Sequence, residues 1–166
     1  MKEVLIKPER CVGCKSCELA CAVAHSRSRT LAGALTEKPA PRKRIYASQW
    51  ESRKFPLNCR HCEEPLCVRV CPTGSMSKDR DTGVVSHQTA LCLGCGMCEL
   101  ACPFGVIGRQ AQGNIIVKCD RCPELEVPAC VTACPTRALL FAEAGEILKS
   151  KREAVGEQLF AQAGNS

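Results

Sequence analysis

Sixteen cysteines are the residues of this chain whose type and spacing could do chemistry. They form four groups of four, and in each group a Cys-x2-Cys pair is followed by two more cysteines at short intervals. The groups are Cys11, Cys14, Cys17 and Cys21; Cys59, Cys62, Cys67 and Cys71; Cys92, Cys95, Cys98 and Cys102; and Cys119, Cys122, Cys130 and Cys134. Closely spaced thiolates bind soft metal ions, so the spacing predicts metal centres.

The intervals between these cysteines favour iron–sulfur clusters over zinc. The first and third quartets have the x2-x2-x3 intervals of bacterial ferredoxins, and the second and fourth lengthen one interval, which an inserted loop can absorb. Three quartets end in Cys-Pro, with Pro72, Pro103 and Pro135 after the last cysteine. A zinc ribbon separates its two pairs by a long hairpin, so a zinc-stabilised interaction module is a remote alternative. Disulfides are disfavoured because the N-terminal residues show no export signal.

A quartet of this kind serves two neighbouring clusters. Its first three cysteines lie on a tight loop around one [4Fe–4S] cubane, and the x3 step directs the fourth thiolate to the other cluster of a pair. Residues 72–91 suit a hairpin with Asp81-Thr82-Gly83 as its turn, so the second and third quartets can form one pair. The first and fourth would then form the other pair, although the intervals also allow sequential pairing of one with two and three with four. Small residues let the loop backbone approach the cluster at Gly13, Gly94 and Gly96.

The composition indicates that metal centres replace an apolar core. Only 4% of the residues are aromatic, which leaves little large side-chain volume for a chain of 166 residues. Short apolar segments before the quartets predict strands over Val4–Lys7, Val84–His87 and Ile115–Lys118. The repeated order of strand, cysteine loop, short helix and strand predicts an α+β fold. We expect two fused bacterial-ferredoxin-like units, each built around two cubane clusters.

This repeat divides the chain into three predicted parts. An outer ferredoxin-like unit comprises residues 1–58 and 108–142 and contains a basic insertion at 22–58. An inner unit comprises residues 59–107. Residues 143–166 form a C-terminal extension that we expect to be helical and to pack on the body or on a partner. The apolar periodicity behind this expectation runs through Ile147, Leu148, Val155, Leu159 and Phe160.

The sixteen cysteines, spread over residues 1–142, resemble those of the four-cluster ferredoxin-like subunits of multisubunit oxidoreductases. That family includes iron–sulfur subunits of molybdenum and tungsten enzymes, of formate and hydrogen enzymes, and of carbon monoxide dehydrogenase. The resemblance implies four [4Fe–4S] clusters with nested pairing. It assigns Cys11, Cys14, Cys17 and Cys134 to cluster 1; Cys21, Cys119, Cys122 and Cys130 to cluster 2; Cys59, Cys62, Cys67 and Cys102 to cluster 3; and Cys71, Cys92, Cys95 and Cys98 to cluster 4. Ala22 replaces the usual proline after Cys21, which leaves the exit from the first quartet more helical.

The resemblance implies a subunit that passes single electrons and is not itself an enzyme. No Gly-rich nucleotide loop is present, and every cysteine belongs to a quartet, so none is left as a nucleophile. The implied partners are a large catalytic subunit with a tungsten or molybdenum pterin or a nickel site, and a further redox subunit or ferredoxin. We expect the small subunit of a tungsten aldehyde oxidoreductase. The alternatives are a carrier associated with carbon monoxide dehydrogenase or hydrogenase, and a freestanding polyferredoxin.

The charge balance argues against a nucleic-acid partner. The formal net charge is +6, but sixteen thiolates and four oxidised cluster cores bring the charge of the loaded protein to about −2. The basic residues therefore compensate the clusters, and no nucleic-acid-binding motif is present. No segment approaches about 18 apolar residues, so we expect no direct membrane insertion. Cysteines that must stay reduced for metal binding predict a cytoplasmic protein.

The basic insertion suits either a solvated loop or a docking surface for an acidic partner. Its basic residues include Arg27, Arg29, Lys38, Arg42, Lys43, Arg44, Arg53 and Lys54. Residues 44–50 predict a strand, and we expect Tyr46 and Trp50 on it to pack beside a cluster, with an interface anchor as the alternative. Exposed clusters at both ends of such a wire would also allow end-to-end self-association.

Four further polar residues could assist the clusters. Because the quartets are complete, His25, His61 and His87 are predicted to have surface or supporting roles rather than to bind metal. Lys118 directly precedes Cys119, so it could donate to a cluster sulfur, lie between clusters or be solvated.

Overall fold

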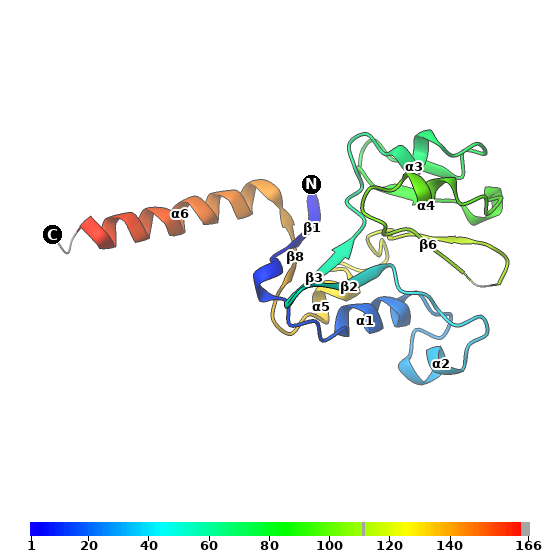
Figure 1. Cartoon of the computed structure of the whole chain (residues 1–166), viewed down its shortest axis with the longest axis horizontal. Coiled ribbons are helices and arrows are strands. Elements are labelled where there is room, and N and C mark those ends of the chain that lie inside the picture. Colours follow the sequence, from blue (N-terminus) through cyan, green and yellow to red (C-terminus); the bar gives the residue numbers. More distant parts are fainter. Residues whose placement is uncertain (111, 164–166) are drawn as a thin grey trace.

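The computed structural model describes residues 1–110 and 112–163 and contains short helices and strands in alternation (Figure 1). The strands are β1 (Lys2–Ile6), β2 (Ile45–Trp50), β3 (Arg53–Asn58), β4 (Met76–Lys78), β5 (Val85–His87), β6 (Gly108–Arg109), β7 (Ile116–Val117) and β8 (Leu139–Glu143). The helices are α1 (Ser16–Ala24), α2 (Leu31–Thr36), α3 (Leu66–Arg69), α4 (Met97–Ala101), α5 (Ala129–Thr132) and α6 (Ala144–Ala163), with short 3-10 turns at Pro8–Arg10 and Thr89–Leu91. The predicted α+β class is confirmed.

The strands form four separate antiparallel pairs, and one of them joins the two ends of the ferredoxin-like body. β1 pairs with β8 from Lys2 opposite Glu143 to Ile6 opposite Leu139. The N-terminal ammonium also lies 2.6 Å from the Glu143 carboxylate. The other pairs are β2–β3, β4–β5 and β6–β7, each between neighbours in the sequence. The β1–β8 pair therefore brings the beginning and the end of the body together, and the other helices and strands of the body lie between these two strands in the sequence.

Two small apolar cores lie in the body, and both contain cysteines from two different quartets. The first core gathers Val4, Cys17, Cys21, Ile45, Cys130 and Leu139. The second gathers Met76, Cys98, Ile107 and Ile116, with Cys67, Cys71, Cys92 and Cys102 packed against it. The first core therefore draws on quartets one and four, and the second draws on quartets two and three. The division at residue 107 stays a prediction, and Ile116 of β7 belongs to the second core.

The β4–β5 hairpin has the turn that the sequence indicated. One carboxylate oxygen of Asp79 accepts hydrogen bonds from the backbone N–H groups of Asp81 and Thr82, at 2.9 and 2.8 Å. Gly83 completes the reversal with a φ of 64°, which glycine adopts without the steric cost of a Cβ. The Asp81-Thr82-Gly83 turn is confirmed, and it brings the strands that follow Cys71 and precede Cys92 together.

The exit from the first quartet is helical, as the missing proline predicted. α1 continues three residues beyond Cys21, whereas α3, α4 and α5 end before the last cysteine of their quartets. The insertion then forms α2, whose first turn is capped by the Thr30 hydroxyl accepting from Gly33 N at 3.2 Å. The Glu37 carboxylate accepts from the backbone N–H groups of Arg27 and Ser28 at 3.0 and 2.8 Å. The insertion is thus an ordered loop held by its own side chains.

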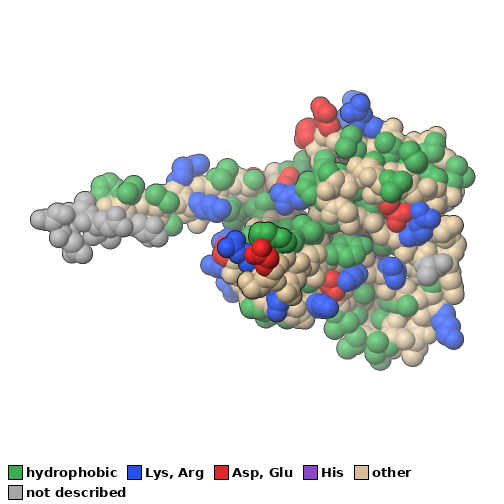
Figure 2. All heavy atoms as spheres, in the orientation of Figure 1, with side chains coloured by type: hydrophobic (Ala, Val, Ile, Leu, Met, Phe, Trp, Pro, Cys, Tyr) green, Lys and Arg blue, Asp and Glu red, His purple; other side chains and the backbone are tan. Residues whose placement is uncertain are grey.

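The predicted C-terminal helix is present as α6, and it extends away from the body (Figure 1). Its apolar side chains are largely uncovered, with Phe160 81% exposed and Leu148, Val155 and Leu159 also exposed (Figure 2). The main contacts of α6 with the body are with β8, which it follows, and with β1. Packing along the body is therefore not observed for the described part of the helix, and residues 164–166 lie outside the described residues. No helix in the described ranges is both long and apolar enough to cross a membrane.

Candidate iron–sulfur centres

The first three cysteines of quartet one meet the last cysteine of quartet four. One cavity is lined by Cys11, Cys14, Cys17 and Cys134, with Ala138, Leu139 and Pro56 among the apolar residues around them. β1–β8 pairing makes this meeting possible, because it places the loop after β1 beside the turn before β8. Four thiols from opposite ends of the chain therefore face one small space.

The last cysteine of quartet one lies near the first three of quartet four. Cys130 is close enough to Cys119, Cys21 and Cys122 for each to oppose its ionisation. Burial is a larger cause than these charges, and it raises the pKa of the Cys130 thiol well above its ordinary value. α1 and α5, which carry Cys21 and Cys130, pack against each other. A second set of thiols is thus brought together in the outer part of the fold.

The middle quartets show the same exchange. Burial raises the pKa of Cys67, the charge of Lys118 opposes this rise, and the nearby thiols of Cys59, Cys102 and Cys62 add to it. Cys98 packs in one core with Cys71 and Cys92. α3 and α4, the short helices of these two quartets, are in contact. Cys102 thus lies near the first three cysteines of quartet two, and Cys71 packs in the same core as cysteines of quartet three.

One backbone conformation recurs in all four cysteine loops. The residue before the second cysteine has a positive φ in each: Gly13 (69°), His61 (48°), Gly94 (65°) and Arg121 (63°). This left-handed step turns the loop back on itself, so that the first two thiols can face the same point. Gly96 (79°) and Lys15 (62°) repeat the step after the second cysteine of the two ferredoxin-spaced quartets. The repeat seen in the sequence is therefore also a repeat in backbone conformation.

Backbone N–H groups donate to several of the sulfur atoms. Arg44 N donates to Cys21 Sγ at 3.2 Å, and His61 N and Gly94 N donate to Cys59 Sγ and Cys92 Sγ at 3.4 Å each. Such bonds stabilise negative charge on sulfur, and around iron–sulfur clusters they raise the reduction potential. The loops thus present both the thiols and the donors that a thiolate cluster requires.

The ionisation of the buried thiols fits a metal centre rather than free cysteine. Burial raises the pKa of Cys17 and of Cys98 to about 11 and that of Cys119 to about 12. At neutral pH these thiols are protonated, so thiolate formation must be coupled to binding of a cation. Burial opposes ionisation of Cys71 too, but hydrogen bonds with Ser75, Met76 and Thr73 bring its pKa down to about 6. The donor set of four thiols at each position suits iron–sulfur clusters.

A charged network ties the first quartet to the fourth. His25 donates from Nδ1 to the Cys21 carbonyl at 2.7 Å and from Nε2 to Asp120 at 3.1 Å. Burial disfavours the charged imidazole, but hydrogen bonds to Asp120, Cys122 and Cys21 raise the pKa of His25 to about 12. The guanidinium of Arg44 forms an ion pair with the other oxygen of Asp120. The network orients both loops, which agrees with the supporting role predicted for His25.

The sequence left open whether His61, His87 and Lys118 are exposed or lie inside the fold, and their burial in the structure answers this for most of them. His61 is 5% exposed and Lys118 is 4% exposed, so the solvated interpretation of Lys118 is wrong. Burial, followed by the charges of Lys118 and Arg121, lowers the pKa of His61 to about 3. Burial also lowers the pKa of His87. The side chains of His61 and Lys118 could not be placed from sequence, because their partners are distant in the chain.

The aromatic residues of β2 differ from expectation. The predicted strand at 44–50 is confirmed as β2, but Trp50 is 62% exposed at its end. Burial of Trp50 against a cluster is therefore not observed, and its exposed side chain instead lines a surface pocket with Cys11. Tyr46 is half-buried, and the ammonium of Lys43 lies 5.3 Å from the centre of its ring.

Comparison with known proteins identifies the family. The 4Fe-4S dicluster domain family matches residues 50–144, and a 4Fe-4S binding domain matches residues 8–24. The B subunit of the anaerobic dimethyl sulfoxide reductase of Haemophilus influenzae is 36% identical over 84% of this protein and 72% of its own length. The electron transport protein HydN of Escherichia coli is 31% identical over 87% of this protein and 89% of its own length. The active site complex BamBC of benzoyl coenzyme A reductase gives a TM-score of 0.48 at 18% identity, covering 100% of this protein and 98% of the matched polypeptide.

The chain belongs to the 4Fe-4S dicluster family of iron–sulfur electron-transfer subunits. It is a non-catalytic subunit of the oxidoreductase type, and its sixteen cysteines carry four [4Fe–4S] clusters.

Proposed function

We propose that this chain carries single electrons between the catalytic subunit of an oxidoreductase and a further redox partner. Each bound cluster supplies a site that accepts and releases one electron. The chain's own residues supply the thiolate ligands, the N–H donors to sulfur and the fixed charges around them. The observation that carries the proposal is the meeting of Cys134 with Cys11, Cys14 and Cys17 at one cavity.

We propose nested ligand sets for the four clusters. The proximity of Cys130 to Cys119, Cys21 and Cys122 supports the second set, and that of Cys67 to Cys59, Cys62 and Cys102 supports the third. Packing of Cys71 and Cys92 in one core with Cys98 is compatible with the fourth, and the presence of Cys67 and Cys102 there supports pairing of the two middle quartets. Sequential pairing would require α1 to face α3, whereas α1 packs on α5 and α3 packs on α4. The outer unit then comprises residues 1–58 and 108–142, and the inner unit residues 59–107.

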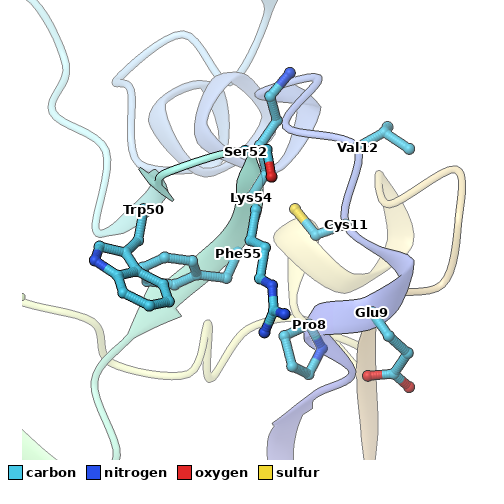
Figure 3. A pocket seen from close by; sticks show the side chains of 9 residues that line it. Pro8, Glu9, Cys11, Val12, Trp50, Ser52, Lys54 and Phe55 are labelled. Carbon is cyan, nitrogen blue, oxygen red and sulfur yellow. The ribbon is translucent and has the colours of Figure 1, made fainter.

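We propose that one redox partner docks beside Cys11. A pocket of about 650 Å³ lies there between the 3-10 turn after β1 and the β2–β3 hairpin, and its lining includes Trp50, Arg53, Lys54 and Cys11 (Figure 3). Trp50 and Val12 are both exposed beside it. Exposed aromatic and arginine side chains are typical anchors of interfaces. Lys54 also lies across Gly13 in the cysteine loop, so a partner that contacts Lys54 sits close to the first cluster.

The catalytic partner is proposed to hold a tungsten or molybdenum pterin or a nickel site, with a tungsten aldehyde oxidoreductase as the first choice. A dimethyl sulfoxide reductase-type enzyme is the second choice, favoured by the name of the 36% identical relative. The second redox partner is a further redox subunit or a ferredoxin. We propose a cytoplasmic location, because sixteen cysteines stay available for metal only where thiols remain reduced.

Metal analysis of anaerobically purified protein tests the cofactor content. We expect about 16 iron atoms and about 16 sulfides per chain, four of each for every [4Fe–4S] cluster. The protein should be brown and should give electron paramagnetic resonance signals on reduction. A colourless, zinc-replete protein would contradict the cluster proposal.

Co-purification tests the partner. A tagged chain expressed in its own cells should retain a large subunit, whose tungsten, molybdenum or nickel content then identifies the enzyme type. Trp50→Ala should weaken this retention about tenfold or more, as interface anchors usually do, while leaving the iron content unchanged. A chain that is isolated without any large metal-bearing subunit would count against the proposal and favour a freestanding polyferredoxin.

A further inference from the structure

A buried lysine joins the outer and inner parts of the fold. The Nζ atom of Lys118, directly before Cys119, donates to the carbonyl of Val85 at 2.5 Å and to the carbonyl of Cys119 at 2.9 Å. Val85 is the first residue of β5 and is 1% exposed. The side chain therefore reaches from the fourth cysteine loop into the hairpin between the second and third quartets.

The same Val85 is held from the other side by the second cysteine loop. Its backbone N–H donates to Nδ1 of His61 at 2.9 Å, and His61 lies between Cys59 and Cys62. One peptide unit on each side of Val85 is thus bonded to a different cluster loop. This places Lys118 at the junction of the loop of Cys59 and the loop of Cys119. The negative charge of Cys59 also helps to raise the pKa of the Cys119 thiol, which agrees with this closeness.

The ammonium of Lys118 has hydrogen-bond partners but no carboxylate partner among the described residues. The two carbonyls satisfy two of its three N–H groups, and no described carboxylate oxygen lies within 4.0 Å. The nearby Asp120 is already paired with Arg44 and His25. A buried ammonium without a counter-charge is strongly unfavourable. The groups that can balance it are the thiolates of the adjoining loops, because Lys118 binds the carbonyl of Cys119 and is joined through Val85 to His61, between Cys59 and Cys62.

We propose that Lys118 is a positioning residue that sets the reduction potentials of the two clusters on either side of the junction. This inference rests on the proposed ligand sets, in which Cys59 and Cys62 belong to cluster 3 and Cys119 to cluster 2. One-electron reduction adds a negative charge to a site, and a fixed cation in a water-poor surrounding stabilises that charge. Lys118 therefore raises the reduction potentials of both clusters.

Potentiometric titration of the loaded protein, followed by electron paramagnetic resonance, tests the role of Lys118. Lys118→Met removes the charge at similar length, and we expect two of the four midpoint potentials to become more negative while the other two stay in place. Lys149→Met on α6, where the side chain is 74% exposed, is the matched control and should change none. Four unchanged potentials in Lys118→Met, or four equal shifts, would overturn the proposal.

A second pair of variants covers the case in which Lys118→Met does not fold. Lys118→Gln keeps a donor for the Val85 carbonyl without the charge, and Lys118→Arg keeps the charge. We expect Lys118→Gln to make the same two midpoint potentials more negative. Lys118→Arg should leave all four potentials at their wild-type values. Wild-type potentials in Lys118→Gln would overturn the proposal. Iron content is measured in the same samples. Fewer than four clusters in the wild-type protein would count against the proposed function, and not only against the role of Lys118.

Discussion

At the scale of single residues, the cysteine loops depend on a left-handed backbone step before the second cysteine. Two loops use glycine for it, and two use His61 and Arg121, for which the same step costs about 1–2 kcal/mol. His61 is also held by its bond from Val85 N, and Arg121 by its bond to the Thr82 carbonyl at 3.3 Å. Non-glycine residues at these positions are thus kept in place by contacts outside the loop.

Gly94 is predicted to be the glycine at which alanine is least tolerated in the loops. Its φ of 65° disfavours alanine by about 1–2 kcal/mol, and an added Cβ would lie 2.4 Å from the carbonyl oxygen of Asn114. Gly74 has a similar φ of 67° but open space around it, so Gly74→Ala isolates the backbone cost. We expect Gly94→Ala to lower the midpoint of thermal unfolding and the iron content more than Gly74→Ala does.

Equal stability and iron content of the two glycine variants would contradict this prediction. It would mean that the contact between Gly94 and Asn114 relaxes without affecting the third cysteine loop. Gly13 is the intermediate case, because the atoms nearest to an added Cβ belong to the flexible side chain of Lys54.

The sequence identified the metal-binding cysteines better than it identified the residues that surround them. The cysteines could be recognised because each quartet is contiguous, and the turn at Asp81-Thr82-Gly83 because its signals are local. The burial of Lys118 could not be predicted, since it depends on Val85, 33 residues earlier. The exposure of Trp50 was missed because strand propensity does not say which side chains of a hairpin are covered by the rest of the fold.

At the scale of elements, each pair of quartets has its own apolar core. Loss of packing in one core should therefore destabilise one pair of clusters before the other. Leu139 of β8 and Met76 of β4 are each 2% exposed, one in the first core and one in the second. Truncation of either to alanine removes packing worth about 2–5 kcal/mol. We expect Leu139→Ala to release iron from the outer pair of clusters first, and Met76→Ala from the inner pair.

Iron release during exposure to a chelator, followed by electron paramagnetic resonance, distinguishes the two pairs. Leu148→Ala on α6 is the control, because this side chain is exposed and its loss should leave release unchanged. Simultaneous release of all four clusters in both core variants would show that the cores do not act independently.

At the scale of the whole molecule, cluster removal should cost most of the tertiary structure. The buried apolar residues are few and are shared with the cysteines, so the cores lose their centres when the metal leaves. Small domains with insufficient apolar burial usually depend on metals for stability. We expect amide hydrogen exchange in β1, β5 and β8 to become fast after iron is stripped anaerobically. Protected amides in the stripped chain would contradict this expectation.

The exposed helix α6 is a surface through which two copies of the chain could associate. Four apolar side chains on it are uncovered, which is unusual for a monomer in water. We predict that the loaded chain exceeds the mass of one copy in light scattering at high concentration, and that removal of residues 144–166 restores one copy. A strictly single-copy mass of the full chain at all concentrations would refute the prediction.

The pairing of β1 with β8 also fixes an order of events during biosynthesis. Residues 59–107 can meet one another as soon as they have left the ribosome, but β1 must wait for Leu139–Glu143. At about 5–20 residues per second this wait lasts roughly 7–30 s. During that time Cys11, Cys14 and Cys17 have been made, but Cys134, which faces them in the finished fold, has not. The inner metal centres can therefore be completed first, and the outer ones only once Cys134 has been made.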